Sequence, residues 1–147
     1  MLAVDVGAKR IGLAVCDPSR TFVFTRGVIA RSDAAVQAGA KAAGRTPPDL
    51  AAVRDLAVEE RAGLLAVGLP LNVDGTEGPA AQEVRVFGAE LSTVAGLPVV
   101  FVDERYTSME ADLALRVRLK DPKERKAKVD AAAAALILRT FLEHGAV

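Results

Sequence analysis

Carboxylate side chains occur at three places in this chain where the neighbouring residues are mostly apolar. Asp103 and Glu104 end the apolar stretch LPVVFVDE (97–104), which is typical of a buried strand. Asp5 lies inside LAVDVGA (2–8), where a charge is costly to bury unless it is paired or binds a metal. Asp130 precedes an alanine-rich run. Brought together, such carboxylates would repel one another, and Mg²⁺ or Mn²⁺ would satisfy them.

The chemistry that Asp5, Glu104 and Asp130 predict is phosphodiester cleavage. One metal ion would help to form the attacking hydroxide, and a second would stabilise the leaving oxygen. Each residue also has a structural interpretation. Asp130 is of the type that caps a helix, Asp5 could be a hydrogen-bonded core carboxylate, and Asp103 could pair with Arg105, because neighbouring strand residues face opposite ways.

The elements that must position these residues alternate in type. Strands are expected at residues 2–8, 11–17, 21–30, 64–70 and 97–104. Helices are expected within 32–62, with a break at Gly44 and Pro47 and a second start at Asp49, and at 80–95, 108–119 and 130–144. Short connections make the first three strands antiparallel, whereas intervening helices make the last two parallel. The order predicts an α/β fold with a mixed five-stranded sheet and helices on both faces, and places Glu104 at the carboxyl end of a strand.

Composition narrows the class of protein. The 147 residues, 51% of them hydrophobic, suit a single domain over residues 1–147. One cysteine, Cys16, and one histidine, His144, exclude an internal disulfide, structural zinc and a Ser-His-Asp triad. Cys16 is expected in the core and His144 at a helix end. With neither a signal peptide nor an apolar run of spanning length, the chain is expected in the cytoplasm and not at a membrane.

Positive charge is local, since Lys plus Arg and Asp plus Glu both number 19. Residues 116–128 carry seven cations against Asp121 and Glu124, a local charge of +5; the cations are Arg116, Arg118, Lys120, Lys123, Arg125, Lys126 and Lys128. This segment is predicted to contact a phosphate backbone, with preference for shape more than for sequence. The alternative is a charged, mobile loop without a partner.

Further nucleic-acid contacts are predicted around the carboxylates. Gly7, Lys9 and Arg10 occupy the turn between the first two strands, where a phosphate could approach. The alternatives are a tight-turn glycine and a solvated turn. The other candidates are Asn72 and Thr76 in a loop of turn-forming residues that includes Gly68, and Arg105 and Thr107 after Glu104.

Four segments together resemble the YqgF/RuvX family, whose members are described as Holliday-junction resolvases or pre-16S rRNA nucleases with a ribonuclease H-like fold. They are DVGAKRIGLAVCDP (5–18), VGLPLNVDGTEGP (67–79), VDERYTSMEA (102–111) and KVDAAAAALIL (128–138). The resemblance covers essentially the whole chain and is weakest at 33–61. It implies acidic site residues at Asp5, Glu104 and Asp130, with an rRNA precursor or branched or single-stranded DNA as partner.

The chain departs from the family pattern at three positions. Tyr106 stands where Leu is usual, Val73 where Met is usual, and Ala133 where the related resolvases have a fourth acid. None of these changes removes one of the three expected ligands. A resolvase needs two opposed active sites, so both a monomer and a homodimer are compatible with the expected activities.

Two other classes of function are compatible with parts of the sequence. DVGAKRIGLAV (5–15) also resembles the phosphate-binding hairpin of actin-like kinases and ATPases, although those enzymes clasp a nucleotide between two such domains. A nucleic-acid-binding module that has lost its chemistry is the other alternative. Metal-dependent nuclease activity is the primary prediction.

Overall fold

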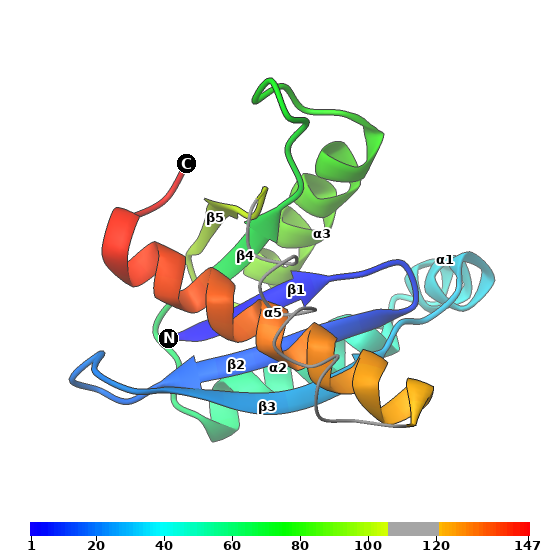
Figure 1. Ribbon diagram of the computed structural model, residues 1–147. Helices are drawn as coiled ribbons and strands as arrows, with labels where there is room; N and C mark the ends of the chain where they lie inside the picture. The colour runs from blue at the N-terminus through cyan, green and yellow to red at the C-terminus, as the bar shows by residue number, and fades with distance from the viewer. Residues whose placement is uncertain (106–120) are drawn as a thin grey trace.

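The computed structural model describes residues 1–105 and 121–147 and confirms the predicted mixed five-stranded sheet. Its strands are β1 (Leu2–Val6), β2 (Arg10–Cys16), β3 (Val23–Ala30), β4 (Leu65–Leu69) and β5 (Val99–Asp103), in the order β3-β2-β1-β4-β5. The hairpins β1–β2 and β2–β3 are antiparallel, whereas β4 is parallel to both β1 and β5. The carboxyl ends of β1, β4 and β5 therefore meet at one edge of the sheet (Figure 1).

The described helices are α1 (Ala34–Ala42), α2 (Pro48–Glu59), α3 (Pro79–Ala95) and α5 (Pro122–His144). Asp33 caps α1 by accepting a hydrogen bond from the amide of Val36 (2.8 Å). Prolines open the other three helices in their first turn, where a missing N–H costs nothing. The predicted break between the first two helices is confirmed, while the helix predicted at 108–119 lies outside the described residues.

The last helix starts earlier than the sequence pattern predicts. It begins at Pro122, and the side chain of Asp121 accepts a hydrogen bond from the amide of Lys123 (3.0 Å). Residues 123–129 are mostly good helix formers, so the capped helix runs straight through the charged stretch. The prediction that Asp130 opens this helix is wrong, and with it the interpretation of Asp130 as a cap. The described part of the basic segment is helix, not loop.

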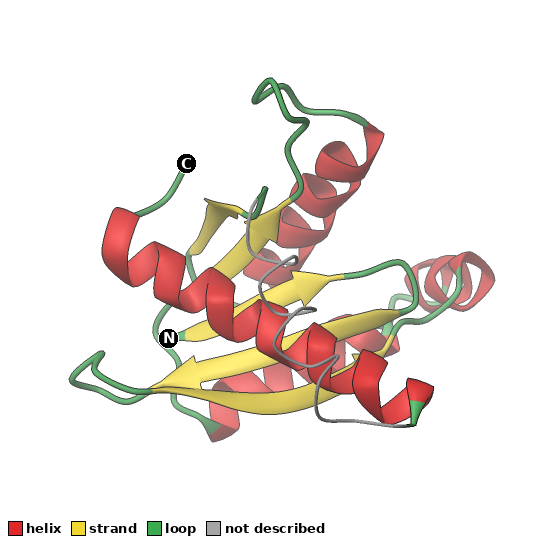
Figure 2. Cartoon of the chain, in the orientation of Figure 1, coloured by secondary structure: helices red, strands yellow, loops and turns green. Residues whose placement is uncertain are grey.

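The two faces of the sheet are covered by different helices (Figures 1 and 2). Helix α5 crosses one face and contacts all five strands, whereas α2 and α3 lie on the other side. Towards α5 the sheet presents Ala3, Ala14 and Ala66, which are fully buried. No helix among residues 1–105 and 121–147 is long and apolar enough to span a membrane.

Candidate active site

Asp5 and Glu104 meet at the carboxyl edge of the sheet. Asp5 lies on β1 and faces α5, as Ala3 does, because alternate strand residues share a face. Glu104 directly follows β5, and its backbone N–H donates to the carbonyl of Leu69 on β4 (3.3 Å). The side chains of Asp5 and Glu104 hydrogen-bond to each other, which requires a proton on one of the two carboxyl groups.

Two glycines make room for this pair. Gly12 on β2 is the sheet partner of Asp5, and Gly68 on β4 follows the Val67 that pairs with Val4. A Cβ at Gly68 would collide with the Glu104 carboxylate and with the Ile137 side chain. A Cβ at Gly12 would collide with the backbone carbonyl of Asp130. The absence of two methyl groups therefore allows Glu104 and helix α5 to approach Asp5.

Sequence reasoning placed Gly68 both in the strand expected at 64–70, which is confirmed, and in the loop that follows, but it missed the role of both glycines. A usable signal was present, because a glycine inside an otherwise apolar strand often marks a place where another group approaches closely. At Gly68 the approaching group is the carboxylate of Glu104, and at Gly12 it is the backbone carbonyl of Asp130 on α5.

Asp130 lies over the same region, on α5, but its carboxylate has a cationic partner. Its Oδ2 is 3.1 Å from Nε of Arg10 on β2, and both side chains are about one quarter exposed, at 27% and 25%. Asp130 nevertheless adds to the repulsion that raises the pKa of Asp5. Among the residues that the structure describes, no three His, Cys, Asp or Glu side chains are arranged to hold a metal ion. The structure thus brings Asp5 and Glu104 together and leaves Asp130 beside them, turned to Arg10.

Burial dominates the electrostatics of the three carboxyl groups. It raises the pKa of Asp5 to about 6, with repulsion from Asp130 adding and the hydrogen bond with Glu104 opposing. It raises the pKa of Glu104 to about 8, helped by repulsion from Asp5. Burial also raises the pKa of Asp130, against the opposing charges of Arg10 and Lys126.

This set of donors suits a hard divalent cation. Carboxylate oxygens are the ligands that Mg²⁺ and Mn²⁺ prefer, and a cation would offset both the burial and the mutual repulsion that keep a proton on the Asp5 and Glu104 pair. Metal binding would release that proton, because ligating carboxylates must be ionised.

The turn between β1 and β2 contains three of the predicted phosphate contacts. The amide of Gly7 donates to the carbonyl of Arg10 (2.8 Å), and a Cβ at Gly7 would lie 2.7 Å from that oxygen. Gly7 is therefore a tight-turn glycine. The side chain of Lys9 is exposed, whereas that of Arg10 is engaged with Asp130.

The loop after β4 is braced by its own polar side chains. Asn72 donates to the hydroxyl of Thr76 (2.9 Å), which in turn donates to Asp74 (2.6 Å). Arg105 pairs with Asp103 (2.6 Å), as the structural interpretation of Asp103 predicts, and donates to the carbonyl of Val73 (3.3 Å). Arg105 therefore ties this loop to the end of β5, and Asn72 and Thr76 remain predicted nucleic-acid contacts.

The first turns of α5 present cations beside the carboxylates. Lys123, Lys126 and Lys128 are exposed and Arg125 is half-buried. Lys126 is close enough to lower the pKa of Asp130. The other predicted residues of this region, Thr107, Arg116, Arg118 and Lys120, lie outside the described residues, as does Tyr106.

The two single residues that composition singled out take the predicted places. Cys16 ends β2, where it is half-buried against the cluster under α5. His144 is the last residue of α5. Neither residue is near the carboxyl pair in sequence or by any contact among the described residues.

Solved structures with the same arrangement define the class of fold. Thermus thermophilus RuvC in complex with a Holliday junction substrate superposes with a TM-score of 0.58 at 17% identity, covering 99% of this chain and 98% of that one. A second Thermus thermophilus RuvC structure gives a TM-score of 0.55 at 14% identity. The domain has a ribonuclease H-like fold.

Sequence relatives define the family within that fold. A family model described as "RuvX: Holliday junction resolvase" matches residues 1–144, and the chain belongs to this family. A protein of Anaeromyxobacter dehalogenans (strain 2CP-1) is 41% identical over 146 residues, which are 99% of this chain and 97% of the relative. A protein of Synechococcus elongatus is 37% identical over 142 residues, 97% of this chain and 87% of the relative. Both are named "Putative pre-16S rRNA nuclease". The predicted family is confirmed.

Proposed function

We propose that this protein is a divalent-metal-dependent nuclease that hydrolyses phosphodiester bonds in structured nucleic acid in the cytoplasm. The observation that carries the proposal is the half-buried Asp5 and Glu104 pair at the carboxyl edge of the sheet, with Asp130 beside it. The family description and the names of the relatives support a nuclease.

Asp5 and Glu104 would hold the metal, Mg²⁺ or Mn²⁺, and Asp130 would be the third ligand. When bound, such a metal supplies positive charge that makes water a better nucleophile and stabilises the leaving oxygen. Asp130 must first turn away from Arg10, because the two side chains are paired at 3.1 Å. That turn would free the guanidinium of Arg10 for a phosphate oxygen, next to the exposed Lys9.

Substrate approach would follow the charge of α5. Lys123, Lys126 and Lys128 are exposed on the turns that lead to Asp130, so a phosphate backbone held there runs towards the carboxylates. These contacts would position the backbone without reading bases.

Of the two candidate substrates, we infer that the 16S rRNA precursor is preferred over a Holliday junction. The names of relatives at 37% to 41% identity support the precursor, and the family description supports the junction. The fourth acid of the related resolvases is absent, since position 133 is a buried alanine that lies 4% exposed. Junction resolution would also require two copies of the site, as in a homodimer.

The test is cleavage by the wild-type protein and the Asp130→Asn variant. The labelled substrates are a structured rRNA precursor fragment, a four-way DNA junction and single-stranded DNA, each with Mg²⁺, Mn²⁺ or a chelator. Asp55→Asn is the matched control, because Asp55 lies on α2 with a side chain 71% exposed.

We expect metal-dependent cleavage by the wild type and the control, but not by Asp130→Asn. The preferred substrate then decides between rRNA maturation and junction cleavage. Equal rates for wild type and Asp130→Asn would contradict the site. If no substrate is cut with any metal, a binding module is the better description, and ATP binding tests the actin-like alternative.

A further inference from the structure

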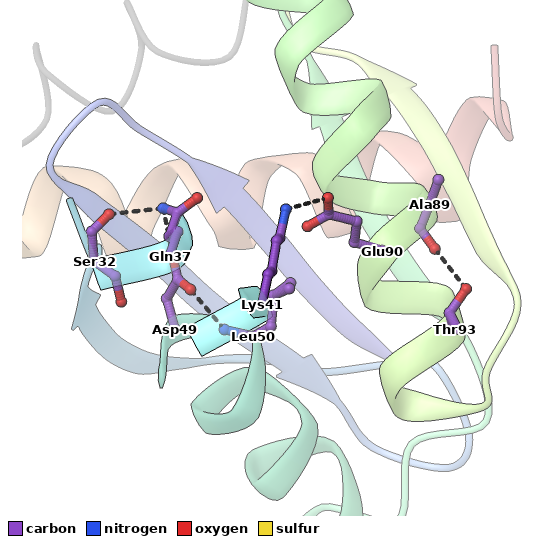
Figure 3. Close-up of polar contacts among 8 residues, drawn as sticks. All are labelled: Ser32, Gln37, Lys41, Asp49, Leu50, Ala89, Glu90 and Thr93. Carbon is purple, nitrogen blue, oxygen red and sulfur yellow. Dashed lines mark hydrogen bonds and ion pairs between the residues drawn. The ribbon is translucent and has the colours of Figure 1, made fainter. Parts of the chain in front are cut away.

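A buried carboxylate lies on the face of the sheet opposite the candidate site. Asp49, in the first turn of α2, is 2% exposed. Its Oδ1 accepts from the amide of Leu50 (2.9 Å), and its Oδ2 accepts a long hydrogen bond from Gln37 of α1 (3.5 Å). Figure 3 shows Gln37 between Asp49 and the carbonyl of Ser32, to which it also donates (2.7 Å). A buried charge of this kind needs a cation.

Arg31 is that cation, and it also contacts the turn between β1 and β2. Its Nε lies 3.9 Å from Oδ2 of Asp49, and its Nη1 donates to the carbonyl of Gly7 (3.1 Å). Its backbone N–H donates to the carbonyl of Lys9 (2.9 Å). The guanidinium also lies 5.6 Å from the ring centre of Phe87 on α3. Arg31 therefore joins α2, α3 and the turn through one side chain and one amide.

The turn that Arg31 holds leads directly to the candidate site. It follows Asp5 and ends at Arg10, whose side chain pairs with Asp130 on the other face of the sheet. Lys9, at its tip, is the exposed cation nearest to Asp5 in the chain. A displaced turn would move both proposed phosphate contacts, Lys9 and Arg10, and would therefore weaken binding of the substrate phosphate.

We propose that Arg31, held by Asp49, is a positioning residue that fixes the turn of residues 7–9 for binding of the substrate phosphate. This role rests on the proposed function. A planar guanidinium suits it, because the fork can face a carboxylate and a carbonyl at the same time, which a lysine ammonium does less well. The buried Nε of Arg31 has no hydrogen-bond partner among the described residues. The guanidinium is therefore held in place by its ion pair with Asp49 and by the hydrogen bond from Nη1 to Gly7.

We call Arg31, its ion-pair partner Asp49 and the carbonyl of Gly7 that it contacts the clamp, and two ion pairs near the clamp supply matched controls. Arg26 on β3 pairs with Glu60, the C-cap residue of α2, so this ion pair joins the strand that precedes Arg31 to the same helix, at a distance from the turn. Arg31 also lines a cavity of about 670 Å³ between α1 and α3, which the Lys41 and Glu90 ion pair spans (Figure 3). Arg26→Gln and Lys41→Gln therefore remove ion pairs near the clamp and leave the clamp itself intact.

The first measurement is amide hydrogen exchange in the protein without nucleic acid, which does not depend on its activity. In Arg31→Gln we expect the amides of Gly7 and Arg31 to exchange roughly 10-fold faster, since the turn loses a charge-assisted hydrogen bond. In Arg26→Gln and Lys41→Gln those amides should exchange at the wild-type rate.

The second measurement is nucleic-acid binding and cleavage. With chelator present, Arg31→Gln should bind a fluorescein-labelled rRNA precursor fragment roughly 10-fold more weakly, with a smaller salt slope because a phosphate contact is lost. With metal present, its KM should rise while kcat stays within about 3-fold, the signature of lost uniform binding. Both controls should match the wild type.

A double variant guards against unfolding. Arg31→Gln leaves the Asp49 charge buried without its cation, whereas Arg31→Gln/Asp49→Asn removes both charges. If Asp49 acts through Arg31, the double variant and Arg31→Gln have the same binding defect. A double variant that binds like the wild type would overturn the role of Arg31.

The remaining outcomes of the exchange, binding and cleavage experiments would also test the proposed role of Arg31. Unchanged exchange of the turn amides in Arg31→Gln would show that there is no clamp. Faster exchange with unchanged affinity and KM would make the clamp purely structural and overturn the positioning role. If the wild type neither binds nor cuts the fragment or a labelled four-way junction, the proposed function fails, and the exchange data alone then report on the clamp.

Discussion

The two faces of the sheet are packed in opposite ways. Strands β1, β2 and β4 each turn an alanine towards α5, namely Ala3, Ala14 and Ala66, and the next position on this face holds Asp5, Gly12 or Gly68. The same strands turn large aliphatic residues towards α2 and α3: Leu2, Val4, Leu13, Val15, Leu65 and Val67. One face therefore carries small residues and the carboxylates, and the other carries most of the large apolar side chains.

This difference separates Asp5, Glu104 and Asp130 from most of the large apolar side chains. Small residues let the backbone of α5 lie close to the sheet, which brings Asp130 over β2 and next to Asp5. The same smallness reduces the apolar area buried on that side, and the free energy of burial scales with that area. The face under α2 and α3 compensates with Leu50, Val53, Phe87 and Leu91.

The largest effect is expected from a substitution on the face of the sheet towards α5, and it should change the cleavage rate but not the stability. Glu104→Gln should lower the cleavage rate by more than about 100-fold. Even a substitution of a residue that only hydrogen-bonds to a metal ligand costs roughly 10–100-fold, and Glu104 is a proposed ligand itself. Initial rates at saturating Mn²⁺ measure this. Glu143→Gln, on α5 with a side chain 71% exposed, is the matched control. A Glu104→Gln rate within a few fold of the control would remove Glu104 from the site.

The opposite pattern is expected on the other face. Leu50→Ala should lower the free energy of unfolding by about 2–5 kcal/mol, since Leu50 is 2% exposed in the larger core cluster. Urea denaturation measures the change. At a temperature where the variant is folded, its kcat should equal that of the wild type. A Leu50→Ala variant that is stable but slow would show that the core on this face contributes directly to the cleavage step.

A substitution at Gly68 should change both the free energy of unfolding and the cleavage rate. Gly68→Ala should lower the free energy of unfolding by about 1–3 kcal/mol and also lower the cleavage rate, because the added methyl displaces Glu104 or Ile137. Gly39→Ala in α1 is the control, since a Cβ there meets nothing within 4 Å. It should raise stability by about 0.5–1 kcal/mol, as alanine does over glycine within a helix. Equal stability changes in the two variants would contradict the close approach at Gly68.

The smallest effect is expected in the pH dependence of stability without metal. Asp5 and Glu104 have folded pKa values of about 6 and about 8, above the ordinary values of 3.8 and 4.5 for these side chains. The unfolded chain thus binds fewer protons than the folded one between pH 5 and 8, so stability falls as pH rises through this window. At about 1.4 kcal/mol per pKa unit, these values correspond to a loss of about 5 kcal/mol over this window. Because both side chains are only half-buried, water screens their charges, and thermal unfolding in chelator should show a smaller loss of about 1–2 kcal/mol in the wild type.

The Glu104→Gln variant sharpens this prediction. It should lose less stability over the same pH range, because no second carboxylate has to ionise beside Asp5. Added Mg²⁺ or Mn²⁺ should raise the unfolding temperature of the wild type more at pH 8 than at pH 5.5. Parallel pH profiles for the two proteins would mean that the carboxyl pair is not the cause.

Much of the fold followed from local pattern. Short apolar strands and their connections predicted the sheet and its mixed direction, and charge within apolar strands singled out Asp5 and Glu104. The start of α5 was missed although a local signal was present, because Asp121 is a capping residue and is followed by Pro122 in the first turn.

The rest of the site depends on register and on contacts across the sheet. Gly12 and Gly68 could be noticed as glycines within strands, but the group that approaches each of them follows only from their places beside Asp5 on neighbouring strands. Arg10 could not be assigned to Asp130, nor Arg31 to Asp49, because each pair joins residues far apart in sequence and each member is ordinary in its own segment. Such pairings need three-dimensional information.

The glycines beside Asp5 have a consequence for how the protein tolerates change. Gly12 and Gly68 provide no ligand and no proton, yet even the smallest added side chain at either position would strike a helix carbonyl or a carboxylate. In a saturation scan scored by activity, these two positions should therefore be as intolerant as Asp5 and Glu104. The limit on variation at this edge of the sheet is set by space as much as by charge.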